Sequence, residues 1–372
     1  MKKILITGGA GFIGSHLADE LLNTGCHVRV LDNLCPQVHG YLDAPPDYLS
    51  KEVEFIFGDV RSSAIVNYAL KNIDVVFHLA ASVGVGQSMY EIERYTQQNS
   101  LGTACLCQCI IDSHHDLEKL VVASSMSIYG EGQYKNKNNQ LVGNTWRTLD
   151  DLKKSQWDPV DEYGSPLEPV ATPETKQPNL ASIYALTKYD QEKMCIITGN
   201  AYNIPTVALR FFNVYGTRQS LSNPYTGVLA IFASRLLNGN PPLIFEDGNQ
   251  KRDFINVKDI TRACRIVLEN RNVRDMTFNI GSGNCYTIMQ IARLLASVMN
   301  KKIDPMITGK YRVGDIRHCF ADIRLANSVL GFSPQVKLED GLSELAQWLE
   351  QQISTDEFDK AAHQLSERRL TL

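Results

Sequence analysis

Short apolar runs alternate with amphipathic stretches over the first two hundred residues of the chain. This alternation is typical of βαβ units on a parallel sheet. The expected strands are residues 3–7, 27–31, 53–57, 75–79, 120–124 and 206–211. The expected helices between them are residues 12–23, 64–70, 90–113 and 182–200. Since βαβ crossovers are right-handed, the pattern predicts an α/β fold, a doubly wound parallel sheet of the Rossmann type.

The segment 131–180 interrupts this alternation. It contains two of the three tryptophans, and its prolines are Pro159, Pro166, Pro169, Pro173 and Pro178. Prolines at this density disfavour regular structure, and a long ordered loop in a compact domain is usually functional. We therefore expect a long insert in the first domain, although a linker is an alternative.

After residue 211 the pattern is mixed, which predicts a second, smaller α+β domain. Helices are expected at 227–238, 257–269, 287–299 and 338–352. We expect domains at 1–210 and 211–350, with residues of about 255–285 returning to the first domain. Residues 351–372 form a polar tail, which we expect to be poorly ordered.

Composition excludes several classes of function. The 372 residues contain 37 Lys and Arg against 41 Asp and Glu, so no basic excess is available to bind nucleic acid. No apolar run approaches the roughly 20 residues of a membrane span, and the start of the chain is interpreted as a strand rather than a signal sequence. We expect a cytoplasmic protein with reduced thiols. Cys105, Cys107 and Cys109 cannot face one ion from a helix, so no metal site is expected.

A glycine-rich turn is the first candidate site. Gly8, Gly11 and Gly14 follow an apolar strand and precede an amphipathic helix, where a tight turn and free N–H groups can bind a pyrophosphate. Asp32 follows Gly14 by 18 residues and ends the second strand, where a carboxylate can accept ribose hydroxyls. Its charge favours NAD over NADP. Asp59 is expected near the adenine, or as a helix N-cap.

A tyrosine and a lysine form the second candidate site. Tyr184 and Lys188 lie four residues apart, on one face of an expected helix. An ammonium and a cationic nicotinamide nearby would favour the phenolate, which makes the phenol a usable base. The segment SSMSIYG, which ends the strand at 120–124, brings hydroxyl groups to the same edge of the sheet.

Taken together, the motifs TGGAGFIG, GDV, HLAA, SSMSIYG, YALTK, RFFNVYG and KRDFINVKDI resemble one family along residues 2 to about 350. This is the extended short-chain dehydrogenase/reductase family, in its NAD-dependent nucleotide-sugar epimerase/dehydratase branch. The resemblance implies that Tyr184 is the base, Lys188 its ribose-binding partner and Ser125 the hydroxyl that bonds the sugar's 4-oxygen. Cofactor contacts are implied at Gly8, Gly11, Phe12, Ile13, Gly14, Asp32, Asn33, Asp59, Val60, Leu79, Ala80, Ala81, Asn99, Tyr184 and Lys188.

The resemblance implies a nucleotide-diphosphate sugar as substrate, bound by Ser127, Asn213, Arg252, Arg312 and Asp315. Arginine suits this task because its planar fork of donors pairs with phosphate oxygens. The family commonly dimerises through two long helices, here 90–113 and 182–200, so a homodimer is implied.

The residues after Ser125 discriminate between the family's reactions. Dehydratases carry Asp and Glu there, whereas this chain has Met126 and Ser127, which cannot transfer protons near pH 7. The resemblance therefore implies a 4-epimerase: hydride leaves C4 of the hexose, the 4-keto sugar turns over, and the hydride returns to the opposite face.

The long insert and the segment YRVGDIRHCFADI resemble a subgroup that acts on dTDP-6-deoxyhexoses such as dTDP-L-rhamnose. Epimerisation of a UDP-hexose or UDP-hexuronate and NAD(P)H-dependent reduction of a 4-keto sugar are the alternatives. A regulatory dinucleotide-binding protein without catalysis is a further one.

Overall fold

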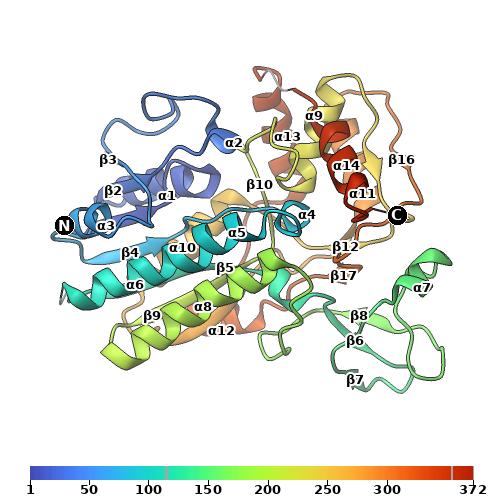
Figure 1. The fold of residues 1–372 in the computed structure, drawn as a ribbon, viewed down its shortest axis with the longest axis horizontal. Coiled ribbons are helices and arrows are strands. Elements are labelled where there is room, and N and C mark those ends of the chain that lie inside the picture. Colours follow the sequence, from blue (N-terminus) through green and yellow to red (C-terminus); the bar gives the residue numbers. More distant parts are fainter. Residues whose placement is uncertain (114–115, 353–354, 372) are drawn as a thin grey trace.

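The computed structural model describes residues 1–113, 116–352 and 355–371. Its centre is a seven-stranded sheet in which every pair of neighbours runs parallel (Figure 1). Across the sheet the strands are β14 (Met276–Ile280), β9 (Thr206–Phe211), β5 (Lys119–Ser125), β4 (Val75–His78), β1 (Lys3–Thr7), β2 (His27–Asp32) and β3 (Glu54–Phe57). The chain winds outward from β1 in both directions, which confirms the doubly wound α/β fold.

Helices cover both faces of this sheet. One face packs against α1 (Phe12–Asn23), α10 (Val257–Glu269) and α12 (Arg324–Leu330), and the other against α3 (Ser63–Ala69), α6 (Gly102–Asp112) and α8 (Ile183–Tyr202). In β1, Ile4 and Ile6 pack into the core on the α1 side of the sheet, while Leu5 packs into the core on the α3 side. Since strand side chains alternate between faces, a sheet covered on both sides needs continuous apolar strands, as the sequence has.

The chain returns to the sheet from its second half. Helix α10 packs on α1, and β14 pairs with β9 so that Phe278 lies opposite Leu209. The strand at 276–280 was not among those expected from the sequence, because the short run MTFNI has little alternation to identify it. The edge of the sheet is therefore completed by residues far along the chain.

The helix expected at 90–113 is present as one unbroken helical run, and the structure adds a π turn within it. It consists of α5 (Ile92–Tyr95), a π-helical turn η1 (Thr96–Leu101) and α6. Asn99 in the π turn is fully buried, and its Oδ1 accepts a hydrogen bond from the Ser82 backbone N–H at 2.7 Å. Single π turns inside helices are frequent at functional sites. This one fastens the helix to the segment after β4.

A second region packs around helices α9 (Val228–Leu237), α11 (Ile288–Val298) and α13 (Leu338–Leu349), which share one apolar cluster. Its strands are β10 (Asn213–Tyr215), β11 (Leu243–Ile244), β12 (Lys251–Arg252), β13 (Phe254–Asn256), β15 (Tyr286–Thr287), β16 (Met306–Ile307) and β17 (His318–Cys319). Further short helices in the first part of the chain are α2 (Pro36–His39), α4 (Val85–Ser88) and the 3-10 turn η2 (Met126–Tyr129).

The proline-rich insert contains regular structure, contrary to the sequence-based expectation. It forms a three-stranded antiparallel sheet in the order β7 (Leu141–Val142), β6 (Gln133–Lys135) and β8 (Glu168–Val170). Helix α7 (Leu149–Lys153) lies in the connection between β7 and β8. Pro169 lies inside β8, which tolerates it because β8 is an edge strand paired on one side only. Figure 1 shows this insert projecting from the body of the molecule.

The polar tail contains helix α14 (Phe358–Glu367), which the sequence did not predict. Its residues Ala361 and Leu365 are buried, so its apolar face packs on the rest of the molecule. Residues 353, 354 and 372 of the expected tail lie outside the described residues. Among the helices of the described chain, none has the length and apolar character needed to cross a membrane.

Lys119 generates a testable prediction about stability. Its side chain is buried, and its Nζ donates to the carbonyl oxygens of Val267 and Asn270 at the end of α10, each at 2.7 Å. Lys119→Met should lower the free energy of unfolding by about 1–3 kcal/mol, because two buried carbonyls lose their donor. Urea denaturation measures this. The exposed Lys51→Met is the control, and equal stability of both variants would contradict the role of Lys119.

Candidate active site

A cavity of about 570 Å³ lies at the carboxyl edge of the large sheet. Its walls come from the ends of β1, β2, β4 and β5, from the start of α8, and from segments of the second region. The winding direction of the sheet reverses between β1 and β4, whose carboxyl ends both open into this cavity. Ligands of doubly wound sheets bind at such a reversal point.

The glycine-rich turn forms one end of the cavity. Gly8 has a left-handed φ of +70°, and a Cβ atom there would lie 2.7 Å from the Ala80 backbone nitrogen. A Cβ on Gly14 would lie 2.4 Å from the Gly8 carbonyl oxygen. Gly11 is the N-cap of α1 and supplies no side chain, so the first N–H groups of the helix stay open toward the cavity. This turn is a cradle for a phosphate group.

Asp32 lies beside this cradle, at the end of β2. Its Oδ2 accepts from the Ala10 N–H at 3.0 Å and its Oδ1 from the Leu34 N–H at 2.9 Å. Burial raises the pKa of Asp32, while these backbone donors and the nearby His39 oppose the shift. Asp32 is therefore a fixed acceptor at the place where the second strand meets the cavity.

Asp59 lines the same end of the cavity, next to Val60. Its carboxylate accepts from Asn33 at 3.0 Å and from Arg61. Burial would raise the pKa of Asp59, but these hydrogen bonds lower it to about 2. Helix α3 begins only at Ser63 with Ser62 as its N-cap, so the alternative of Asp59 as N-cap is wrong.

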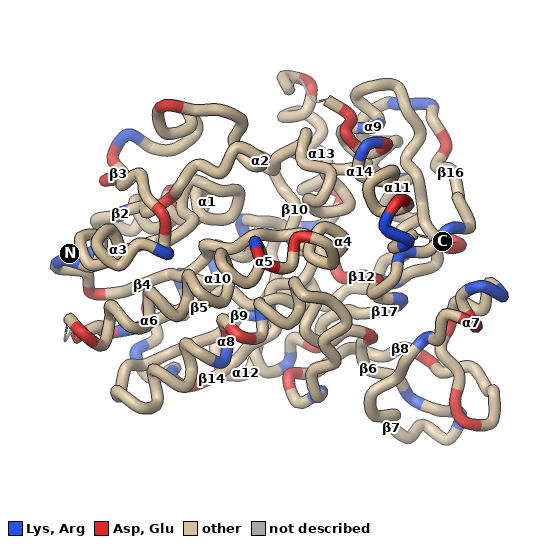
Figure 2. The backbone as a smooth tube through the Cα atoms, viewed as in Figure 1, with Lys and Arg blue, Asp and Glu red and all other residues tan. Residues whose placement is uncertain are grey.

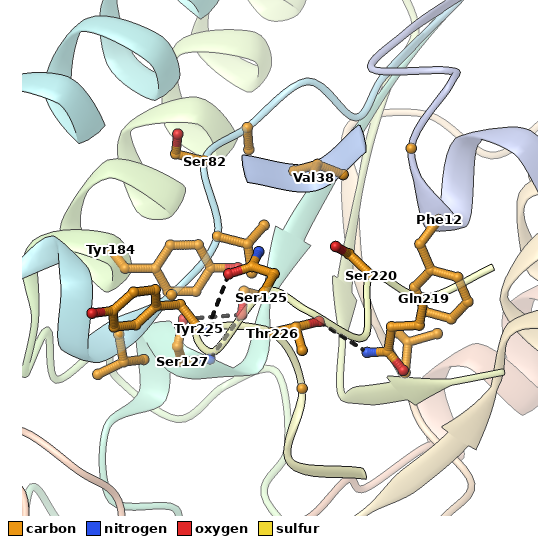
Figure 3. A pocket seen from close by; sticks show the side chains of 18 of the residues that line it. Phe12, Val38, Ser82, Ser125, Ser127, Tyr184, Gln219, Ser220, Tyr225 and Thr226 are labelled. Atoms are coloured by element: carbon orange, nitrogen blue, oxygen red, sulfur yellow. Dashed lines mark hydrogen bonds between the residues drawn. The ribbon is translucent and has the colours of Figure 1, made fainter. Parts of the chain in front are cut away.

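Ser125 and Ser127 lie at the other end of the cavity, where β5 ends. The Ser125 Oγ accepts from the Ser127 backbone N–H at 3.2 Å and from the Ser127 Oγ at 2.9 Å. The turn η2 thus directs both hydroxyls into one place, as Figure 3 shows. Met126 between them is buried.

Tyr184 points toward Ser125 from the first turn of α8 (Figure 3). Its backbone N–H donates to Ser88 Oγ at 3.0 Å, and its ring meets the Tyr95 ring edge-on at 6.4 Å. Burial raises the pKa of Tyr184, and a hydrogen bond with the Ser125 side chain opposes that shift. The phenol therefore needs further positive charge nearby before it can ionise near pH 7.

Lys188 lies one helical turn after Tyr184 and also lines the cavity. Its Nζ donates to the Ala123 carbonyl oxygen and to Gln191 Oε1, both at 2.6 Å. Burial lowers the pKa of Lys188 to about 8, so the ammonium predominates at neutral pH. The lysine can therefore place positive charge beside the phenol.

Gln191 was not identified from the sequence, although it lies on the face of α8 next to Lys188. Its Nε2 donates to Thr103 Oγ1 at 2.8 Å and to the Ala80 carbonyl oxygen at 3.1 Å. The same side chain thus holds Lys188 with one atom and the segment after β4 with the other. A polar residue three positions after the lysine on a buried helix face is the signal that could have found it.

A buried ion pair fastens α8 to the sheet. Arg210 of β9 donates to Glu192 through Nε at 2.9 Å and Nη2 at 2.7 Å. Ser124, the neighbour of Ser125, donates its hydroxyl to the same carboxylate at 2.6 Å. Glu192 is fully buried. The strand that bears Ser125 and the helix that bears Tyr184 are thus joined through one carboxylate.

Two arginines face the cavity from the second region. Arg252 of β12 donates to the carbonyl oxygens of Ile316 and Arg317. Arg312 lies 3.1 Å from Asp315 Oδ2, and its guanidinium stacks over the Phe245 ring at 4.6 Å. Burial would raise the pKa of Asp315, but the two arginines outweigh it and hold the pKa below its usual value. Asn213 lines the same wall and donates to the Asp253 carbonyl oxygen.

The structure brings nearly all the expected site residues into one cavity. The expected residues that line it are Gly8, Gly11, Phe12, Ile13, Gly14, Asp32, Asn33, Asp59, Val60, Leu79, Ala80, Ala81, Ser125, Ser127, Tyr184, Lys188, Asn213, Arg252, Arg312 and Asp315. Asn99 does not line the cavity, because its amide is directed inward to Ser82 and Thr187. It supports the wall rather than facing the cavity.

Two further lining residues had no signal in the sequence. Tyr225 comes from the loop before α9, and Phe358 from the start of α14. The Tyr225 hydroxyl donates to Gln364 at 2.7 Å, and Gln364 belongs to the same helix α14 as Phe358. Their place in the cavity wall depends on tertiary packing, which the sequence does not show.

Known proteins are similar to this chain in sequence and fold. The model of the NAD dependent epimerase/dehydratase family matches residues 4–148 and 160–281. A dTDP-L-rhamnose 4-epimerase of Burkholderia thailandensis is 34% identical over 355 residues, which cover 95% of this chain and 96% of that protein. A UDP-glucuronic acid 4-epimerase from Bacillus cereus, solved with UDP-glucuronic acid and NAD, is 29% identical with a TM-score of 0.77, covering 94% of this chain and 99% of that one.

A third similar protein is a UDP-N-acetylglucosamine 4-epimerase from Methanobrevibacter ruminantium M1, in complex with UDP-N-acetylmuramic acid. It is 30% identical with a TM-score of 0.76, covering 95% of this chain and 99% of that chain. The family match extends over most of the residues that build the cavity. The chain therefore belongs to the NAD dependent epimerase/dehydratase family.

Proposed function

We propose that this protein is an NAD-dependent nucleotide-sugar 4-epimerase, with a dTDP-6-deoxyhexose such as dTDP-L-rhamnose as its substrate. The observation that carries the proposal is the position of Ser125, Tyr184 and Lys188 at one end of a cavity whose other end is a phosphate cradle beside Asp32. In this proposal, a cofactor that spans the cavity meets a sugar beside this phenol, hydroxyl and ammonium.

The residues of the cradle fit the family's cofactor. The open N-terminus of α1 suits its pyrophosphate, and the Asp32 carboxylate suits the adenosine ribose hydroxyls. Arg29 donates to the carbonyl oxygens of Ala69 and Lys71 and does not line the cavity, so it offers no charge to a 2′-phosphate. When bound, NAD accepts hydride from C4 of the sugar and later returns it.

Three side chains form the catalytic group in this proposal. Tyr184 takes the proton of the sugar's 4-hydroxyl as a phenolate and gives it back after the hexose has turned over. Ser125 bonds the 4-oxygen. Lys188 binds the nicotinamide ribose and stabilises the phenolate by its charge. Rotation of the hexose requires that the nucleotide be bound firmly and the sugar loosely.

The composition of the cavity wall argues against dehydration. The carboxylates among its described lining residues are Asp32, Asp59 and Asp315, and none of them neighbours Ser125 along the chain. Met126 and Ser127 occupy the positions where dehydratases carry their acid and base, so no adjacent group can remove a proton from C5. Epimerisation needs no such group.

Asn213, Arg252 and Arg312 are proposed to bind the diphosphate and the nucleoside. All three line the cavity wall that the second region forms. The identity with the Burkholderia thailandensis protein supports a dTDP-sugar, whereas the likeness to the Bacillus cereus enzyme supports the alternative of a UDP-hexose or UDP-hexuronate.

The positions of β14 and α10 support a two-domain organisation. We assign residues 1–210, about 255–285 and helix α12 to the NAD-binding domain and the remainder of 211–350 to the nucleotide-sugar-binding domain. Helix α12 was expected in the second domain but packs on the large sheet. The first assignment rests on the pairing of β14 with β9 and the packing of α10 on α1.

A panel of nucleotide sugars tests the function. Purified protein is incubated with dTDP- and UDP-hexoses without added NAD, and the products are followed by NMR. The expected result is a 4-epimer of one substrate, formed without net redox change. A product that forms only with stoichiometric NADH or NADPH would contradict epimerisation and support the reductase.

Tyr184→Phe should lower kcat by about 10²–10⁴-fold without loss of bound NAD, because the base is removed. Unchanged turnover would refute the role of Tyr184 as base.

The charge of Lys188 should affect the pH dependence of turnover. A cation beside the phenol lowers the phenol's pKa, so Lys188→Met should move the acid limb of the kcat/KM profile to higher pH by about 1–3 units. The profile between pH 5.5 and 9.5 measures the shift. Lys51→Met, an exposed lysine outside the cavity lining, is the control. An acid limb that stays in place would show that Lys188 does not tune Tyr184.

A homodimer is the proposed assembly. Leu186 and Ile197 are 42% and 64% exposed on α8, and their spacing of three helical turns puts them on one face. Leu101 of the neighbouring η1 is also exposed. Light scattering should give twice the mass of the chain, and Ile197→Glu should reduce it to that of a monomer because a charge would be buried. A wild-type monomer would contradict the assembly.

A further inference from the structure

The segment 312–317 carries two of the charged residues that face the cavity, Arg312 and Asp315. It lies between β16 and β17 and has no regular secondary structure apart from one bridge between Arg312 and Thr371. A helix or a sheet ladder therefore does not fix its peptide groups. Its conformation depends on hydrogen bonds from elsewhere in the chain.

Three residues of the insert 131–180 supply such bonds. Arg147 donates through Nη2 to the Asp315 carbonyl oxygen at 2.8 Å. Glu131 accepts from the backbone N–H groups of Arg317 at 2.9 Å and His318 at 3.2 Å. Asp158 accepts from the Arg317 Nε at 2.8 Å. The insert thus bonds backbone groups of Asp315, Arg317 and His318 and the Arg317 side chain. Backbone bonds from outside the insert also hold the segment, since the Val313 N–H donates to the Leu370 carbonyl oxygen and the Lys251 N–H to that of Arg317.

Arg147 is central to these contacts. Its Nε donates to Glu131 at 2.9 Å and its Nη1 to Glu246 at 2.6 Å, so one guanidinium joins the insert, the second region and segment 312–317. All three side chains are at least nine-tenths buried. Figure 2 shows acidic and basic residues together near β12 and β17, where the insert meets the rest of the molecule. Desolvated ion pairs of this kind fix geometry, since breaking one leaves a buried charge without its partner.

The same peptide groups set the direction of Arg252. Its guanidinium donates to the carbonyl oxygens of Ile316 and Arg317, the residues that follow Asp315. A shift of this segment would therefore move Arg252 and Arg312 together. Ser125, Tyr184 and Lys188 would stay in place, because β5 and α8 hold them through the Glu192 carboxylate instead.

We propose that the insert 131–180 positions the nucleotide-binding arginines, and that Arg147 is the positioning residue through which it acts. This inference rests on the proposed function, in which Arg252 and Arg312 bind the diphosphate of a nucleotide sugar. The insert is then a part of the substrate site that touches no substrate. Its removal affects binding of the nucleotide rather than the chemical step.

The test compares binding with turnover in Arg147→Met. Titration calorimetry with dTDP and with UDP should show a Kd raised about tenfold or more for the nucleotide that the wild type binds, because misplaced arginines lose their bonds to phosphate. KM for the sugar substrate should rise in parallel, while kcat and the content of bound NAD stay near the wild-type values. Arg252→Ala should show the same pattern and serves as the reference for direct loss of contact.

Two further variants keep the result interpretable. Arg147→Met leaves the Glu131 carboxylate buried without its cation. Glu246 still has a cationic partner, because the Arg317 Nη1 donates to it at 2.9 Å. The double variant Glu131→Gln with Arg147→Met therefore removes the unpaired charge of Glu131 as well. Lys135→Met is the matched control, since Lys135 is a cation of the same insert that pairs with Glu168 on its surface. It should leave Kd unchanged.

The outcomes separate the two claims. A wild type that binds neither dTDP nor UDP would contradict the proposed function itself. A wild type that binds one of them, with folded Arg147 variants whose Kd is unchanged or whose kcat alone falls, would overturn the positioning role. If both Arg147 variants lose bound NAD and thermal stability together, the network serves folding and the positioning role is likewise overturned.

Discussion

The buried ion pair between Glu192 and Arg210 is the constraint on which the site depends. Glu192 receives two bonds from Arg210 of β9 and one from Ser124 of β5, while it belongs to the helix that carries Tyr184 and Lys188. Arg210 also donates to the Tyr129 hydroxyl at 2.7 Å, which in turn donates to Asn279 of β14. A fully satisfied buried network specifies one arrangement of the elements that share it. The relation of the phenol to the Ser125 hydroxyl follows from this network.

The two ends of the cavity are held by different means. The glycine turn is fixed by backbone contact, because no side chain fits between Gly14 and Gly8 or between Gly8 and Ala80. The wall formed by the second region is fixed by side chains together with a few isolated backbone bonds, since the segment that bears Arg312 and Asp315 has almost no regular structure of its own. A rigid cradle with a separately supported substrate wall suits an enzyme that keeps its cofactor while successive sugars enter and turn.

Much of the fold could be predicted from the sequence, because local patterns determine it. The first and last strands of the expected series, 3–7 and 206–211, have the observed bounds, and so does the helix 12–23. The proposed catalytic residues could be found because their motifs lie at strand ends and on one helix face. The π turn at Asn99, the strand at 276–280 and helix α14 could not, since each depends on a partner distant in the chain. Tyr225 and Arg147 were missed for the same reason, whereas Gln191 had a local signal in its place three residues after Lys188 on the same helix.

The central claim is that hydrogen leaves C4 of the sugar and returns to the same carbon within one binding event. The most direct measurement uses the nucleotide sugar that the protein converts, labelled with deuterium at C4, in ordinary water. The account predicts that the 4-epimer retains the deuterium at C4, as seen by mass spectrometry and by the missing C4 proton in the NMR spectrum. Replacement of that deuterium by solvent hydrogen during epimerisation would contradict it.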